Sequence, residues 1–365
     1  MAKKLIRVWL FSLTIVLFSS ISVFAEDSYA EYSARGDFFI KNVVINGERI
    51  VNYNLQYSII LYNDVMYIPF TPEMREIYGL QVEMDWESHT LRLRVVDPTR
   101  ANISENWLKN DARPLFLNVI PDVTVVAHAS SETREVYMGE LPLLQIDGHF
   151  YLPLRALSNN DLVNWDIYYN THFGITISTN GNIPASTFFD HREALKNRGL
   201  LRYIMRHNPR ITPTYGTQYV FLFRRAGEVF DISPLMLMAL AHRESTFNNG
   251  AIGRGGSAGL MQVMPATGAR HGLTPQQLLD PKTSIDFGAM YLRQRLDAFD
   301  NDIVLALSAY NQGSGAVSRG NFTTTFAERV IATYQAVHYF LEVYGYVYPR
   351  LAYEAYSPYE TYSPY

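Results

Sequence analysis

A change in hydrophobic periodicity constrains this chain more than any other feature. Up to about Ser178, short stretches alternate apolar and polar residues, as half-buried β-strands do. Beyond Asn180, apolar residues recur at intervals of three and four, the spacing of amphipathic helices. We therefore expect a multi-domain chain, with a β-rich (α+β) region followed by an all-α region. The expected helices are Arg192–Arg206, Tyr219–Phe230, Pro234–Glu244, Thr283–Phe299, Ile303–Tyr310 and Phe326–Val343.

Turn residues divide the first region into hairpins. Two-residue pairs that favour tight hairpin turns stand between the alternating stretches. These pairs are Asn46-Gly47, Asn63-Asp64 and Asp147-Gly148. The stretches Leu61–Phe70 and Gln145–Leu154 share a tyrosine and a proline at the same places, 84 residues apart. Each stretch leads to a tryptophan-containing segment, around Trp86 and Trp165. This similarity predicts a tandem or decayed repeat.

Three stretches of the first region resemble the copper amine oxidase N-terminal-like domain, a small β-rich module of bacterial surface proteins. They read Ile45-Asn46-Gly47-Glu48, Tyr67-Ile68-Pro69-Phe70 and Met84-Asp85-Trp86. The resemblance implies one or more such modules within residues 37–180. No histidines and carboxylates stand at metal-ligand spacing, so no metal is expected despite the family name. The module is expected to act as a spacer, a wall attachment or a subunit contact, and it could contact the cell wall or another envelope protein.

The first 25 residues have the pattern of a secretory signal peptide. Basic residues precede an apolar run from Val8 to Phe24, and Val23-Phe24-Ala25 ends it as a small-x-small cleavage site. The alternative is an uncleaved membrane anchor, because the run is at the short limit for a membrane helix. We expect cleavage, export, and a location in the cell envelope or outside the cell. The chain has no cysteine, which excludes disulfides and cysteine nucleophiles.

Charge also separates the two regions. Residues 26–195 carry 12 basic and 23 acidic side chains, whereas residues 196–345 carry 15 basic and 10 acidic ones. The positive balance of the second region suits an anionic polymer, or is ordinary surface charge. It includes no run of basic residues, and export also argues against a nucleic-acid partner.

The most chemically suggestive helix of the second region ends at Glu244. Ser233-Pro234 is a typical N-cap and first-turn pair, and the residues up to Ala241 are apolar on every face, which predicts a buried helix. Burial disfavours a carboxylate, and the negative end of the helix dipole adds to that effect. Both raise the pKa of Glu244, as a general acid working near neutral pH requires.

Glycine-rich and amide-rich motifs follow Glu244 in order. They are Glu244-Ser245, the glycine-rich stretch from Gly250 to Gln262 with Gly259-Leu260-Met261-Gln262 at its end, Gly288-Ala289-Met290-Tyr291, and Ala309-Tyr310-Asn311. Glycine allows a bulky ligand to approach the backbone, and Gln, Tyr and Asn supply neutral partners for sugar hydroxyls and acetamides. With these motifs, residues from about Phe221 to Tyr344 resemble the catalytic domain of soluble lytic transglycosylases, which is lysozyme-like.

The resemblance implies a role for each matching residue. Glu244 is the catalytic acid and base, and Ser245 helps to orient the reacting centre. Met261 and Gln262 line the glycan groove, while Tyr310 and Asn311 face the acid and the sugar. The alternative for Met261 and Tyr310 is simple packing in the core.

Four positions depart from the family pattern. Gly253 stands where the family usually has Ser, and Ser257 where it has Ala. Ser284 stands where Asn often precedes Ile, and Gln312 where Ala is common. None of the four removes the acid, but together they affect the expected subsites and substrate preference.

The expected reaction follows from a single acid. Positions 245–279 contain no carboxylate, so the glycine-rich stretch cannot supply the second one that most glycosidases use. Asp286, Asp297 or another acidic residue would have to arrive through folding. The resemblance implies cleavage of peptidoglycan strands between N-acetylmuramic acid and N-acetylglucosamine, giving a 1,6-anhydro end without metal or cofactor. The alternatives are a hydrolytic muramidase and a non-catalytic glycan-binding wall protein.

The expected organisation has five parts: a signal peptide (1–25), the β-rich module or modules (37–180), a helical connector (181–215), the lytic transglycosylase domain (216–345) and a Tyr/Ser/Pro tail (346–365). The tail repeats Tyr-Ser-Pro-Tyr twice. Such a low-complexity terminus is typical of a mobile segment, or of one that adheres to wall polymer.

Overall fold

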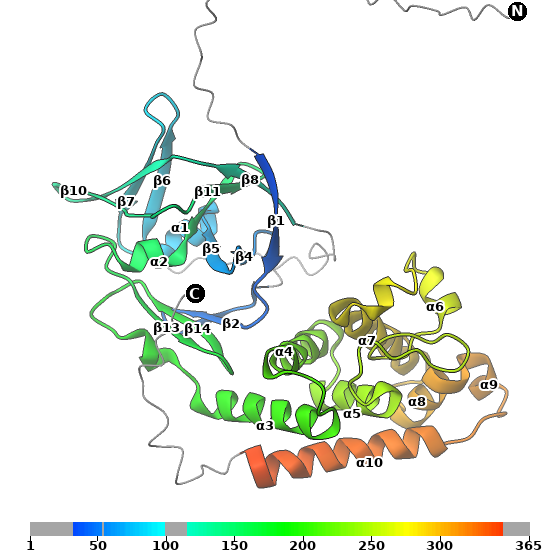
Figure 1. Cartoon of the computed structure of the whole chain (residues 1–365). Helices are drawn as coiled ribbons and strands as arrows, with labels where there is room; N and C mark the ends of the chain where they lie inside the picture. The colour runs from blue at the N-terminus through cyan, green and yellow to red at the C-terminus, as the bar shows by residue number, and fades with distance from the viewer. Residues whose placement is uncertain (1–31, 53–54, 99–114, 346–365) are drawn as a thin grey trace, which may run out of the picture.

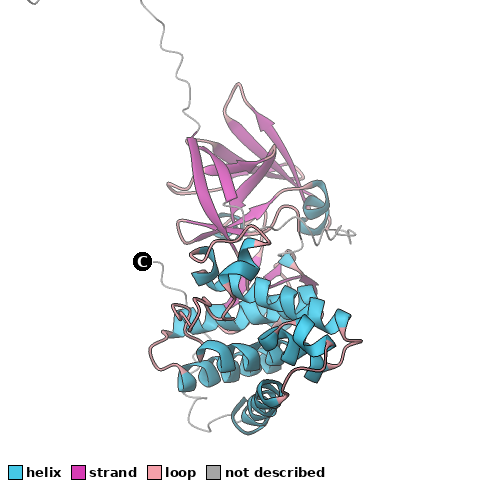
Figure 2. Ribbon diagram, turned by 90° about the vertical axis from the view of Figure 1, so that its right-hand side faces the viewer, coloured by secondary structure: helices cyan, strands magenta, loops and turns pink. Residues whose placement is uncertain are grey.

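The chain forms a strand-rich body and a helical body, joined by a short connection (Figures 1 and 2). The computed structural model describes residues 32–52, 55–98 and 115–345. The predicted leader and the predicted tail lie outside these residues. The order of the two bodies agrees with the expected change from strands to helices near residue 180.

Six antiparallel strands close into a barrel, in the order β1-β4-β5-β12-β11-β8. Its interior is filled by Ile60, Tyr67, Leu117, Leu144 and Tyr151, which are all fully buried. The strands are β1 (Tyr32–Phe38), β4 (Ile60–Tyr62), β5 (Val65–Pro69), β8 (Leu115–Ile120), β11 (Leu143–Ile146) and β12 (His149–Pro153).

Two four-stranded sheets flank the barrel, in the orders β10-β9-β7-β6 and β13-β14-β2-β3. In each sheet, two hairpins from distant parts of the chain meet through one parallel contact, β7 with β9 and β14 with β2. The three turn pairs expected from the sequence join β2 to β3, β4 to β5 and β11 to β12. The strands are β2 (Asn42–Ile45), β3 (Glu48–Ile50), β6 (Leu80–Asp85), β7 (Thr90–Val95), β9 (Thr124–Ala129), β10 (Glu132–Glu135), β13 (Asp166–Asn170) and β14 (Gly174–Ser178).

The same order of elements occurs twice in this body. Two strands, a short helix and two strands run from β4 through α1 (Pro72–Tyr78) to β7, and again from β11 through α2 (Leu154–Ser158) to β14. The two series meet where β5 pairs with β12, and Ile68 lies opposite Leu152 at the centre of the contact. Tyr67 then faces Pro153, and Tyr151 faces Pro69, so the contact is close to symmetric.

The helical body is built around the apolar faces of its long helices. Side-chain caps define where several of them begin: Thr212 accepts from Tyr215, Asp280 from Thr283, and Asp302 from Val304 and Leu305. Ser233, the expected cap of α5, makes no side-chain cap, and Pro234 alone marks that start. The elements are η2 (Ala185–Phe188), α3 (His191–His207), α4 (Pro213–Phe230), α5 (Pro234–Ser245), α6 (Pro265–Ala269), η3 (Gln277–Leu279), α7 (Pro281–Ala298), α8 (Ile303–Gln312), α9 (Ser314–Ser318), α10 (Thr325–Phe340) and a π-helical turn η4 (Leu341–Gly345).

Helix α3 belongs to the helical body and also contacts the strand-rich one. It packs against α4, α10 and η4, and Leu200 and Ile204 lie in the helical core. Near its other end, Ala194 packs with Val44 and Phe173 of the strand-rich body. The residues expected to form a connector therefore contribute to both cores.

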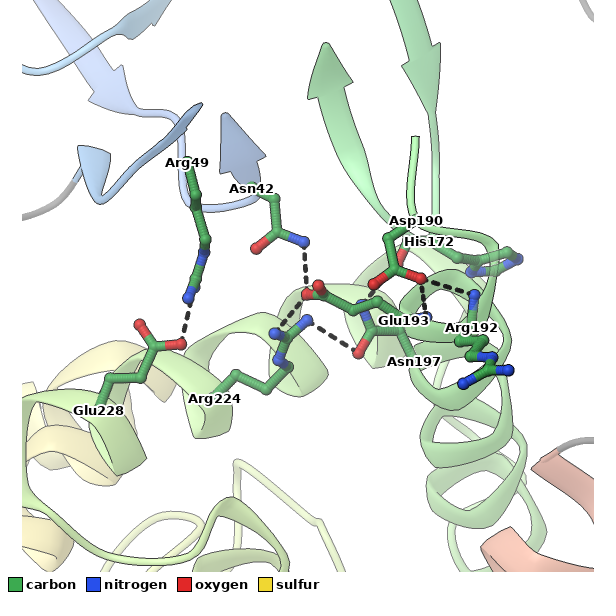
Figure 3. A network of polar contacts seen from close by, with 9 residues as sticks. All are labelled: Asn42, Arg49, His172, Asp190, Arg192, Glu193, Asn197, Arg224 and Glu228. Carbon is green, nitrogen blue, oxygen red and sulfur yellow. Dashed lines mark hydrogen bonds and ion pairs between the residues drawn. The ribbon is translucent and has the colours of Figure 1, made fainter. Parts of the chain in front are cut away.

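Polar contacts join the two bodies across α3 and α4 (Figure 3). Arg49 on β3 pairs with Glu228 on α4 at 2.7 Å. Asn42 on β2 donates to Glu193 on α3 at 2.7 Å, and Glu193 also pairs with Arg224. These contacts fix the orientation of the strand-rich body on the face formed by α3 and α4.

Candidate active site

Glu244 lies in the last turn of α5, at the end of a buried helix. The preceding residues Leu237 to Ala241 are fully buried, as the apolar run predicts. The helix ends because Thr246 adopts a left-handed conformation with φ of 52°, and its amide donates to the carbonyl of His242. Glu244 itself is half-buried, and burial raises the pKa of its carboxyl from 4.5 to about 7. The group is thus close to half-protonated at neutral pH.

Tyr310 on α8 lies close enough to Glu244 for the charge of that acid to affect its pKa. Its hydroxyl donates to the carbonyl of Met261 at 2.9 Å, and its ring contacts Tyr291 edge-on at 5.3 Å. Burial, and then the nearby charge of Glu244, raise the pKa of Tyr310 well above its usual value. Tyr310 therefore stays neutral and keeps its proton for hydrogen bonding.

Ser245 joins the end of α5 to the glycine-rich loop. Its hydroxyl lies 2.8 Å from the carbonyl oxygen of Leu260 and 3.1 Å from that of Ala241, and donates toward both. Because Ser245 directly follows Glu244, this contact fixes the backbone that carries the acid relative to the loop. It gives a physical basis for the orienting role expected of Ser245.

The side chain of Met261 is fully buried, which argues against the groove-lining role expected for it. It packs onto Gly288, where an added Cβ would lie only 2.7 Å from it. Its amide donates to Ser284 Oγ at 3.1 Å, and its carbonyl accepts from Tyr310. The side chain of Met261 is thus packed in the core, as the alternative expectation says. Its backbone amide and carbonyl make the contacts with Ser284 and Tyr310. The motif alone does not show this, because the space for Met261 comes from Gly288 on α7.

Gln262 is half-buried and directed into the loop. Its Nε2 donates to the carbonyls of Ala251 and Gly259 at 3.0 and 2.9 Å, and its Oε1 accepts from Ser257 at 2.8 Å. These bonds hold a residue whose φ of 46° is left-handed and uncommon outside glycine. The amide therefore shapes the loop wall, in addition to any contact with a ligand.

Asn311 is exposed at the end of α8, directly after Tyr310. The next residue, Gln312, accepts from the amide of Thr323 at 3.0 Å and donates to its carbonyl at 2.7 Å. Gln312 and Ser284 were noted in the sequence only as departures from the family pattern. In the structure Gln312 holds the segment that follows α9, and Ser284 accepts a hydrogen bond from the amide of Met261 in the glycine-rich loop.

Asp286 and Asp297, the two acidic residues that the sequence analysis names as a possible second carboxylate, each have another partner. Asp286 accepts from Arg225 at 2.6 Å and from Lys282 at 2.9 Å. Asp297 pairs with Arg293 at 2.8 Å. Within the part of the chain that the structure describes, burial is the cause of the raised pKa of Glu244, and no second carboxylate contributes to it. The described geometry thus supports chemistry with one acid.

Two further findings concern the described residues. Within them, no group of three or more histidine and acidic side chains is placed to hold a metal ion. No helix in the same part of the chain is both long and apolar enough to cross a bilayer.

Comparison with known proteins identifies relatives of part of this chain. The soluble lytic murein transglycosylase of Salmonella typhimurium is 36% identical over 147 residues, which are 38% of this chain and 22% of the relative. That of Escherichia coli strain K12 is 35% identical over 150 residues, covering 39% and 23%. The membrane-bound lytic murein transglycosylase C of Histophilus somni is 29% identical over 194 residues, covering 40% and 53%.

The chain thus spans less than a quarter of the length of the soluble relatives. A crystal structure of the 70-kDa soluble lytic transglycosylase of Escherichia coli is 25% identical over 42% of this chain and 33% of that one, with a TM-score of 0.34. Residues 221–329, which carry Glu244, the glycine-rich loop and Tyr310, match the family model described as the Transglycosylase SLT domain.

Proposed function

We propose that this protein is a lytic transglycosylase that cleaves peptidoglycan strands between N-acetylmuramic acid and N-acetylglucosamine, with Glu244 as both acid and base. The observation that carries the proposal is a single half-buried acid with a pKa raised to about 7, placed within the segment that matches the SLT domain. The relatives named above are lytic murein transglycosylases, which supports the same class of substrate.

The proposed reaction balances with this one acid. Glu244 donates its proton to the glycosidic oxygen while the bond from that oxygen to the anomeric carbon of the muramic sugar breaks. The acetamide of the same sugar stabilises the electron-poor carbon, in place of an enzyme nucleophile. The resulting carboxylate then removes the proton of the 6-hydroxyl as its oxygen attacks the anomeric carbon. The product has a 1,6-anhydro end, and Glu244 is protonated again.

The neighbouring residues supply the positioning that this route needs. A positioned acid–base group contributes about 10²- to 10⁴-fold to a rate, so orientation and electrostatic fit must supply the remainder. Ser245 and Tyr310 donate to two successive carbonyls of the loop, those of Leu260 and Met261, at 2.8 and 2.9 Å. We propose that Gln262 and Asn311 contact the glycan beside this frame, Gln262 from the loop wall and Asn311 from the exposed end of α8.

Digestion of purified peptidoglycan followed by mass spectrometry tests the proposal. We expect anhydro-muramic products, lighter by one water than hydrolytic products, and no product from Glu244→Gln. Glu328→Gln, an exposed acid on α10, is the matched control and should keep full activity. Reducing muramic ends would instead show a hydrolytic muramidase, and binding without cleavage would show a wall-binding protein. Normal activity of Glu244→Gln would refute the assignment.

We further propose that the strand-rich body is a copper amine oxidase N-terminal-like module with an internal repeat. The two successive series of strand, strand, helix, strand and strand support a repeat, as does the near-symmetric pairing of Ile68 with Leu152. We also propose that the chain is exported and acts in the cell envelope, from the leader pattern of residues 1–25 and the peptidoglycan substrate. In that setting the module would contact wall polymer or another envelope protein.

A further inference from the structure

Gly253 and Ser257 face each other across the glycine-rich loop. The amide of Gly253 donates to the carbonyl of Ser257 at 2.8 Å. A Cβ added to Gly253 would lie 2.3 Å from Ser257 Oγ and 2.5 Å from Gln262 Oε1. The φ of Gly253 lies outside the left-handed range, so its backbone conformation does not require glycine. What excludes a side chain at position 253 is the space that the Ser257 hydroxyl and the Gln262 amide already occupy.

The Ser257 hydroxyl completes the hydrogen bonding of the Gln262 amide. Gln262 Nε2 uses both of its protons on backbone carbonyls of the loop, at 3.0 and 2.9 Å. Its Oε1 faces the opposite direction and accepts the Ser257 proton at 2.8 Å. The two carbonyls fix the orientation of the amide, because a flip would set Oε1 against both of them, and the Ser257 hydroxyl then supplies the proton that Oε1 accepts.

The orientation of this amide bears directly on the acid. Leu260 and Met261, the two residues before Gln262, present the carbonyls that accept from Ser245 and Tyr310. Ser245 directly follows Glu244, and the pKa of Tyr310 is raised in part by the charge of Glu244. A change in the backbone at Gln262 therefore alters both hydrogen bonds beside the acid.

We propose that Ser257 is a positioning residue for the reaction at Glu244, and that its hydroxyl occupies a place which a serine at position 253 could fill instead. This inference rests on the proposed function, because the positioning it describes is that of a catalytic acid. Positions 253 and 257 together have one role, which is to supply the hydroxyl that donates to Gln262 Oε1. One hydroxyl is needed beside Gln262 Oε1, and the loop has room for only one.

A set of three variants of the full chain tests the pair: Ser257→Ala, Gly253→Ser, and the double variant with both changes. We expect Ser257→Ala to lower kcat on uncrosslinked glycan strands by about 3- to 10-fold, with less effect on KM, because one hydrogen bond that orients the loop is lost. We expect Gly253→Ser to lower kcat at least as much, because two hydroxyls compete for one place. The double variant should recover to within about 3-fold of the natural chain, since the single hydroxyl now comes from position 253 and the end of the Gln262 side chain shifts away from the added Cβ, which would otherwise lie 2.5 Å from its Oε1.

Gly250→Ser is the matched control. It lies in the same loop without left-handed φ, and an added Cβ would meet only Asn248 Oδ1, at 3.7 Å. It should change kcat less than about 2-fold, as surface substitutions without special contacts usually do. A double variant whose loss equals the product of the two single losses would overturn the inference, because the two hydroxyl positions would then not be interchangeable.

Thermal unfolding of the same variants separates failure of this inference from failure of the proposed function. If the natural chain cuts no glycan, the function is wrong, but the hydroxyl exchange still predicts that the double variant melts higher than Gly253→Ser. If the natural chain is active and the double variant shows recovery in neither kcat nor melting temperature, the function stands and the role of Ser257 is refuted.

Discussion

The ionisation of Glu244 has a cost to stability that a single substitution should remove. Burial raises the pKa of its carboxyl from 4.5, the value expected in the unfolded chain, to about 7. The folded state therefore binds the proton more tightly than the unfolded state does. Stability contributed by the protonated form is fully present below pH 4.5 and is lost as the pH rises to about 7. At about 1.4 kcal/mol per pKa unit, the loss is about 3 kcal/mol at pH 8.

Glu244→Gln keeps the shape of the side chain and removes the titration. We expect the variant to be about 3 kcal/mol more stable than the natural chain at pH 8, and equal to it within error at pH 4.5. Urea unfolding of both proteins at half-unit intervals of pH, followed by helical circular dichroism, measures this difference. Glu328→Gln, on the exposed face of α10, should show no such pH dependence.

The test depends on how the stability difference between Glu244→Gln and the natural chain changes with pH. A gain in stability that begins above pH 4.5 and levels off above pH 7 would agree with a carboxyl ionising reluctantly in a buried place. A difference that does not vary with pH, or a variant that is less stable at pH 8, would refute the reasoning. The same variant should be inactive, so stability and activity should change in opposite directions.

Three further predictions follow from contacts of the helical body. Gly288→Ala should destabilise the protein by about 1–3 kcal/mol in urea unfolding, because its Cβ would meet Met261 at 2.7 Å; an unchanged midpoint would show that the methionine can move aside. Asp286→Asn should cost about 3 kcal/mol at pH 7, since it weakens the pairing of the buried Arg225, and a loss below 1 kcal/mol would contradict this. Tyr310→Phe should lower the cleavage rate by about 10-fold through loss of its 2.9 Å hydrogen bond, with little change in melting temperature, and an unchanged rate would exclude a role for the hydroxyl.

The sequence predicts well those features that depend on neighbouring residues. Alternation and turn pairs identify the hairpins, because Asn46 and Asp147 tolerate the left-handed conformations that they adopt there. The spacing of apolar residues identifies the long helices, and the apolar run before Glu244 correctly predicts a buried helix and a raised pKa.

Features that depend on distant residues could not be predicted in this way. The parallel contacts of β7 with β9 and of β14 with β2 join segments whose pairing no local pattern specifies. Met261 is buried because Gly288 leaves room for it on another helix. Gly253 and Ser257 are two separate departures from a family pattern in the sequence, and only the structure shows that a Cβ at position 253 would meet the Ser257 hydroxyl.

In each flanking sheet, strands from distant hairpins pair in parallel, and this affects how the strand-rich body can fold during synthesis. The hairpin of β2 and β3 can pair with β14 only after synthesis has continued for more than a hundred residues. In the same way, β7 can pair with β9 only after β9 has been synthesised. A fragment ending between the two series would therefore expose unpaired strand edges, which are prone to aggregate. Contacts of such long sequence separation also slow folding. The body should mature as one cooperative unit, and neither half should be obtainable alone as a soluble product.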